Sequence, residues 1–150
     1  MLGKSKMKYT ELIGMVLKND ILCDLFETYD TQVIYEYDRT HENIDDEYYA
    51  EIKDLGLHFV FDKNQKFTTL FIHQIEIDTF TPFEDDIKIF SSKQEALDYG
   101  KNISQTYTEG KADFFGETKD WIKFQHKNYS VHYEFVNHKL KMITLQNEKA

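Results

Sequence analysis

The sequence predicts an α+β domain in which N-terminal helices pack on an antiparallel sheet built from a hairpin and a C-terminal three-strand meander. Three patterns support this prediction. Apolar residues recur every three to four positions through the first third of the chain, as they do on amphipathic helices. From Leu55 onward, apolar and polar residues alternate, which is typical of half-buried strands. Short runs of Asn, Asp and Lys separate the alternating segments, so neighbouring strands should be joined by tight turns.

The first third of the chain should form either two short helices or one bent helix. The apolar residues on the helical face are Leu12, Met15, Val16, Ile21, Leu22, Leu25, Phe26 and Tyr29. Thr10 and Asp20 are the predicted N-caps, because a short side-chain oxygen can accept hydrogen bonds from the unpaired amides of the next turn. A break is expected at Lys18-Asn19. Residues 1–8 contain three lysines and no acid, and should form a flexible basic N-terminus.

The middle of the chain should contribute a hairpin. Residues 29–50 are polar and acidic, and Val33-Ile34-Tyr35 within them fits either a strand or an ordered loop. The alternating residues Leu55, Leu57, Phe59 and Phe61 share one face of the next strand. Residues 62–66 should turn it back into a return strand at residues 67–75.

A loop, a helix and a second loop should follow the hairpin. Residues 78–90 contain the only proline, Pro82, and an acidic triplet, so they should cross the surface. Ser92 and Glu95 form a capping box, which predicts a helix start, and Gly100 stands where a glycine would end that helix. Residues 101–118 are expected to form the second loop.

Three alternating segments predict the C-terminal meander, with strands at residues 121–126, 129–136 and 140–145. Lys127-Asn128 and Asn137-His138 should form the turns, since asparagine tolerates positive φ. In the middle strand, the residues expected to face the core are Val131, Tyr133 and Phe135. This orientation turns His132 and Glu134 outward.

Length and cysteine content indicate one intracellular domain spanning residues 1–150. A single cysteine, Cys23, cannot form an internal disulfide, which favours the reducing conditions of the cytoplasm. The N-terminus lacks the apolar run of a signal peptide, and no stretch approaches the roughly 20 apolar residues of a membrane span. A cytoplasmic protein is therefore expected.

The net charge of −9 is concentrated in one segment of the chain. Twelve acids lie between Asp20 and Asp54 against two bases, Arg39 and Lys53, so this segment carries −10 and the remainder +1. Such a field repels the phosphates of nucleic acid and anionic lipid, and it attracts a basic protein. A basic protein partner is expected, and direct binding to nucleic acid or membrane is not.

The sequence contains no complete catalytic, metal-binding or nucleotide-binding signature. His73 and Glu76 are three residues apart, and His132 and Glu134 share a strand face, but neither pair is a known ligand pattern. Cys23 lies among apolar helix residues, where a buried thiol would stay protonated. No serine sits in a glycine-flanked elbow and no glycine-rich loop precedes a helix. We expect no enzymatic activity, metal or cofactor.

Tyrosines are interleaved with the acidic segment, and this combination suits a protein-binding surface. Tyrosine offers a large contact area with a polar end and is enriched in interface hot spots. The predicted contact residues are Asp45, Asp46, Glu47, Tyr48 and Tyr49, with Glu84, Asp85 and Asp86 as a second patch. Two different roles for these residues stay open. The acids could form a hydrated surface that maintains solubility, and several tyrosines could pack in the core.

The order of features from Gly56 onward carries a family resemblance. These features are Gly56-Leu57-His58-Phe59-Val60-Phe61-Asp62 with a return strand, Pro82 before a loop and a short helix ending at Tyr99-Gly100, and Trp121 opening a meander that closes on Ile143-Thr144-Leu145. In this order, which spans about two thirds of the chain, the sequence resembles the small immunity proteins encoded beside bacterial toxins, including those of contact-dependent inhibition and related polymorphic toxin systems. The resemblance implies that the chain binds one cognate toxin and blocks its active site or substrate surface. It assigns no contact residue, because these vary between members.

The leading hypothesis is therefore an immunity protein that occludes a basic toxin domain, such as a nuclease. The alternative is a small enzyme or ligand-binding protein whose pocket, between the meander and the helices, uses His132, Glu134 or His73. A third possibility is a structural subunit of a larger assembly.

Overall fold

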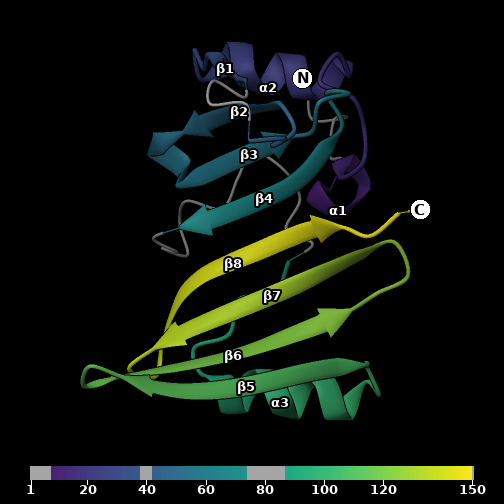
Figure 1. Ribbon diagram of the computed structural model, residues 1–150. Helices are drawn as coiled ribbons and strands as arrows, with labels where there is room; N and C mark the ends of the chain where they lie inside the picture. Colours follow the sequence, from purple (N-terminus) through teal and green to yellow (C-terminus); the bar gives the residue numbers. More distant parts are fainter. Residues whose placement is uncertain (1–7, 38–41, 74–86, 150) are drawn as a thin grey trace.

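The computed structural model describes residues 8–37, 42–73 and 87–149, and it shows one large antiparallel sheet with helices packed against it (Figure 1). Eight strands follow the order β1-β2-β3-β4-β8-β7-β6-β5. In Figure 1 the helices α1 and α2 lie toward the β1–β4 half of the sheet, and α3 lies beside β5 and β6. The predicted α+β class is confirmed.

The described helices are α1 (Tyr9–Leu12), α2 (Asp20–Thr28), the short 3-10 helix η1 (Lys53–Leu55) and α3 (Lys93–Asn102). The strands are β1 (Val33–Glu36), β2 (Glu47–Ile52), β3 (Leu57–Phe61), β4 (Phe67–His73), β5 (Tyr107–Phe114), β6 (Glu117–Gln125), β7 (Tyr129–Val136) and β8 (Lys139–Asn147). The segment Val33-Ile34-Tyr35, whose sequence fits either a strand or a loop, is therefore a strand.

Both N-caps predicted for the first two helices are wrong by one or two residues. Helix α1 begins at Tyr9 after Lys8, whose side chain makes no capping bond, so Thr10 is already inside the helix. Asn19 caps α2, because its Oδ1 accepts hydrogen bonds from the amides of Ile21 at 2.9 Å and Leu22 at 3.3 Å. Asp20 is the first helical residue, where its negative charge favours the N-terminal end of the helix dipole.

One face of the sheet carries the core, and all the larger helices pack on it. The strand register aligns inward residues across five strands: Phe59, Leu70, Leu145, Val131 and Phe124. Helix α2 packs Phe26 edge-on against Phe59, with ring centroids 5.1 Å apart. Helix α3 brings Gly100 against Phe124 on the same face. As predicted, Val131, Tyr133 and Phe135 are buried, and together the buried residues form one hydrophobic cluster.

The prediction of a second loop at residues 101–118 is wrong, because this segment contains β5. All eight residues of β5 pair with β6, so four antiparallel strands follow α3 in succession. Gly110 is a strand-weakening residue in the sequence pattern. Here its missing side chain leaves room for the Trp121 ring, which a Cβ at this position would overlap. The turn at Asn137-His138 has positive φ in both residues, as in a type I′ hairpin turn.

Helix α3 begins as predicted but ends later. Ser92 Oγ accepts from the Glu95 amide at 3.2 Å, which is half of a capping box, while the Glu95 carboxylate accepts from Ser91 Oγ. Gly100 does not end the helix, which continues to Asn102. A Cβ on Gly100 would lie 2.7 Å from Phe124 Cε1, so close packing explains the glycine better than helix termination does.

Candidate partner-binding surface

The surface that stands out is the outer edge of the sheet at β1. In the described part of the chain, β1 pairs only with β2, and all four of its residues are exposed. Eight large hydrophobic side chains are exposed among the described residues, and five of them lie between positions 33 and 44. We call these five the edge surface: Val33, Ile34, Tyr35, Tyr37 and Ile44. A concentration of exposed apolar side chains of this kind usually marks an interaction site.

The opposite edge of the sheet, β5, is built differently. It carries charged residues of both signs at Glu109, Lys111 and Asp113, and Lys93 of α3 pairs with Glu109 at 3.0 Å. Charged side chains on an edge strand discourage pairing with other chains. The only charged residue of β1 is Glu36. Of the two edges, β1 is therefore the one suited to receive a partner.

Hydrogen bonds and ring contacts hold the tyrosines of the edge surface in place. Tyr35 Oη donates to Asp46 Oδ2 at 2.6 Å. Mainly because of this hydrogen bond, with smaller contributions from desolvation and the charge of Asp46, the pKa of Tyr35 is raised to about 12. The Tyr35 ring lies 4.9 Å from that of Tyr48 and 6.1 Å from that of Tyr37. The hydrogen bond links β1 to the residue that precedes β2.

The predicted contact residues lie around β1 but not on one face. Because side chains alternate along β2, Tyr48 packs toward the core beside Tyr35, whereas Tyr49 lies on the outward face and stacks on His58 at 5.5 Å. Tyr49 Oη donates to Glu36 at 3.2 Å. Asp45 pairs with Lys63 at 3.6 Å. The structure thus places two groups of acids and tyrosines on the two sides of β1.

The second predicted patch, Glu84, Asp85 and Asp86, lies outside the described residues, as do Glu76 and Pro82.

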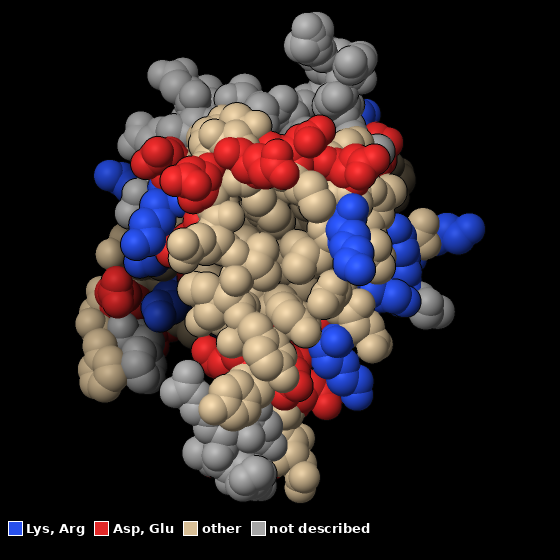
Figure 2. All heavy atoms as spheres, turned by 90° about the horizontal axis from the view of Figure 1, so that it is seen from above, with Lys and Arg blue, Asp and Glu red and all other residues tan. Residues whose placement is uncertain are grey.

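Acidic residues surround the edge surface. Helix α2 and the turn after it expose Asp20, Asp24, Glu27 and Asp30, and the strand segment exposes Glu36, Glu47 and Glu51. Figure 2, which looks down on the α2 and β1 end, shows a row of acidic side chains beside a broad uncharged area, with Lys and Arg at the sides. The sequence placed the negative charge in one segment, and the fold keeps much of it at one end of the molecule.

Two of these acids face each other. Glu36 of β1 and Glu47 of β2 are direct cross-strand partners. Like charges in this position destabilise a sheet by roughly 0.2–1 kcal/mol. A cation placed between or beside them would remove this repulsion.

The contact set predicted from the sequence contains none of the five edge-surface residues. In the sequence, the apolar run Val33-Ile34-Tyr35 fits either a strand or an ordered loop. The exposure of this segment depends on the position of β1 at the edge of the sheet. No local sequence pattern reveals that position.

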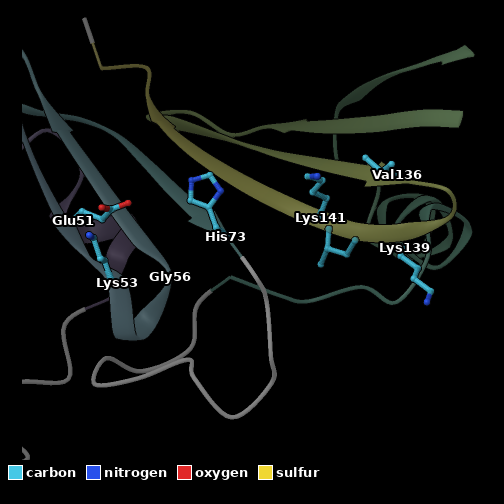
Figure 3. Close-up of a pocket in the computed structure, with 8 residues that line it drawn as sticks. Glu51, Lys53, Gly56, His73, Val136, Lys139 and Lys141 are labelled. Atoms are coloured by element: carbon cyan, nitrogen blue, oxygen red, sulfur yellow. The ribbon is translucent and has the colours of Figure 1, made fainter. Parts of the chain in front are cut away.

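An open pocket of about 880 Å³ lies where the end of β4 separates from the β7–β8 hairpin. Its described lining residues are Glu51, Lys53, Gly56, His73, Val136, Lys139, Leu140 and Lys141. Figure 3 shows His73 between Glu51 and Lys53 on one side and Lys141 on the other. Three lysines against one glutamate make this pocket basic.

The histidine and carboxylate expected in the alternative function do not share this pocket. His132 and Glu134 lie on the outward face, opposite to the helices, so a pocket between the meander and the helices would not contain them. His132 stacks on Trp121 at 5.4 Å, and desolvation lowers its pKa. Of the three residues considered, only His73 lines the basic pocket. Among the described residues, no three His, Cys, Asp or Glu side chains cluster in a way that could hold a metal ion.

Cys23 is half-buried rather than buried, and its Sγ donates to the Leu17 carbonyl at 3.5 Å. In the described residues no helix has the length and apolar character needed to cross a membrane.

Comparison of the chain with protein-family models, curated proteins and solved structures found no match.

Proposed function

We propose that this protein binds a basic protein through the β1 edge surface and the acids around it, and that the partner is a bacterial toxin domain whose active site or substrate surface it covers. The observation that carries the proposal is the apolar, exposed edge strand bordered by carboxylates. The identification of the partner as a toxin rests on the sequence resemblance to immunity proteins. In this proposal the protein acts by occlusion and performs no catalysis.

Charge and apolar contact have separate roles in the proposed complex. The acids attract a basic surface over a distance and so raise the association rate. The tyrosines and aliphatic residues at positions 33–37 lose their solvent contact on binding and slow dissociation, since buried aromatic side chains dominate interface energetics. The carboxylate pair Glu36 and Glu47 selects for a cation at the centre of the contact.

A charge-reversal experiment tests the proposal against the product of a toxin gene, if one lies beside the gene for this chain. The test variant combines Asp45→Lys, Asp46→Lys and Glu47→Lys. The control variant combines Asp98→Lys, Asp113→Lys and Glu117→Lys, which are exposed positions on α3, β5 and β6 at the far end of the sheet. Both variants change the formal charge from −9 to −3, so only the position of the charge differs.

The association rate measured by stopped flow should fall about tenfold or more for the test variant at 20 mM salt, and much less for the control. The two rates should converge at 500 mM salt, where the Debye length is only about 4 Å. Equal rates for the two variants at every salt concentration would remove the steering argument. Absence of a toxin gene from the neighbourhood would remove the toxin from the proposal and leave the basic partner.

The basic pocket favours a second candidate function, the binding of a small anionic ligand. Lys53, Lys139 and Lys141 line it together with His73. Inorganic phosphate or citrate should then raise the melting temperature above that in sodium chloride of equal ionic strength. The double variant Lys139→Gln, Lys141→Gln should lose this effect, and Lys119→Gln, Lys127→Gln, whose lysines are exposed outside the pocket, should keep it.

A further inference from the structure

We infer that the partner adds an extended, basic segment of its backbone to the outer edge of β1, and that the acids around this edge hinder the same pairing with a second copy of the chain. The inference rests on the proposed function, because it specifies how the same surface would engage its partner.

The position and composition of β1 carry the first step. An outer strand presents alternate backbone N–H and C=O groups to solvent, and an added strand can pair with them. In the described part of the chain no strand lies beyond β1, and the strand Val33–Glu36 is exposed along its whole length. An added strand would also cover exposed apolar side chains on both faces of the sheet. These are Val33 and Tyr35 on one face and Ile34 on the other.

The side chains on the outward face specify the chemistry of the added strand. Glu36 lies in register with Glu47, and Tyr49 donates to the Glu36 carboxylate. A lysine or arginine of the added strand placed beside Glu36 would form an opposite-charge cross-strand pair, which stabilises a sheet. An apolar residue two positions away would lie beside Ile34. The site therefore fits a strand in which basic and apolar residues recur on the same face.

The same charges argue against a second copy of this chain as the occupant. Pairing of β1 with its own copy would bring two segments of charge −10 together. Such like-charge contact opposes association in protein interfaces. Edge β5 is protected by charged residues on the strand itself, whereas β1 is protected from self-pairing by the acids around it. That form of protection disappears when the approaching strand is basic.

Synthetic peptides can test the inference before any partner has been identified. The probe is a capped seven-residue peptide whose odd positions, which share one strand face, read Lys-Val-Lys-Val, and whose even positions are threonine. Two further peptides carry backbone N-methyl groups on the odd or the even residues, which removes the hydrogen-bond donors of one strand edge and keeps every charge. A peptide with glutamate in place of lysine is the charge control.

Strand addition predicts that the lysine peptide binds, and that at least one N-methylated peptide binds about tenfold more weakly. Hydrogen exchange measured by NMR should slow at the β1 amides that point away from β2. Exchange at the amides of the other edge strand, β5, should be unchanged. The glutamate peptide should not bind. Equal binding of all three lysine peptides, with no slowing at β1, would overturn strand addition and leave the proposed function standing. Failure of every basic peptide to bind at low salt would instead count against the basic partner.

Sedimentation without peptide tests the second half of the inference. The wild-type chain should stay monomeric at 50 mM salt. The variant Glu36→Gln, Glu47→Gln should self-associate at lower protein concentration than the wild type does. Concentration-dependent protection of the β1 amides in the wild type at low salt would assign the edge to a second copy and overturn the inference.

Discussion

Gly56 offers a direct test of the packing that joins η1 and β3 to β4. Its φ is +67°, a left-handed conformation that costs a residue with a Cβ about 1–2 kcal/mol. A Cβ at this position would also meet the carbonyl oxygen of His73 closer than the 3.0 Å below which real contacts of this kind essentially never occur. The obstructing atom is backbone, so it cannot rotate away as a flexible side chain would.

The expected loss of stability is the sum of three costs: the clash, a strained hydrogen bond and the backbone conformation. Moving the β4 end away from Gly56 in Gly56→Ala resembles overpacking, which costs about 1–3 kcal/mol. It also strains the hydrogen bond from the His73 amide to the Gly56 carbonyl, now 2.7 Å, whose loss costs about 1 kcal/mol. With the conformational cost of about 1–2 kcal/mol, the free energy of unfolding should fall by about 3–6 kcal/mol. That loss is a large part of the stability of a typical domain, about 5–15 kcal/mol.

Gly116 supplies the matched control. Its φ is +80°, but a Cβ there would meet no atom within 4 Å, so Gly116→Ala should lose only the conformational 1–2 kcal/mol. Urea unfolding can be followed by the fluorescence of Trp121, the only tryptophan, and by circular dichroism. Equal losses for the two variants would refute the close approach between Gly56 and the end of β4.

Two further predictions concern helix α3 and the outward sheet face. Gly100→Ala should lower the free energy of unfolding by up to about 2 kcal/mol, because overpacking against the Phe124 ring costs about 1–3 kcal/mol and the helix-propensity gain is only about 1 kcal/mol. The added variant Phe124→Leu should weaken this penalty in a double-mutant cycle, and stabilisation by Gly100→Ala alone would contradict the packing. The pKa of His132 is lowered chiefly by desolvation and also by Lys123, against an opposing effect of Glu134. The unfolded chain therefore takes up a proton at this histidine at higher pH than the folded chain does. Because protonation then favours the unfolded chain, the free energy of unfolding should fall as the pH drops from 7.5 to 5.5. Urea midpoints of wild type and His132→Gln across this range should show a smaller loss in the variant, and parallel curves would show that His132 contributes nothing.

Much of the local structure was predictable because its causes lie close together in the sequence. Alternation places Leu57, Phe59 and Phe61 on one face whichever strands lie beside them, and these residues are buried. Ser92 caps α3 through an amide three residues away. The errors arose where one local pattern fits two structures. Gly100 fits a helix end by pattern, but the Phe124 ring from a strand more than 20 positions later decides its role.

By itself, the sequence determined the α+β class, the alternating strands and the concentration of negative charge between Asp20 and Asp54. Only the tertiary structure decided that β8 pairs with β4 and that β1 ends the sheet, which turns Val33, Ile34 and Tyr35 into a surface. The physical reason is that a strand's own residues set which side chains share a face, whereas its neighbours are chosen by pairing across long stretches of chain. Seventy-odd residues separate Leu70 from its partner Leu145, and nothing in either local pattern specifies the other.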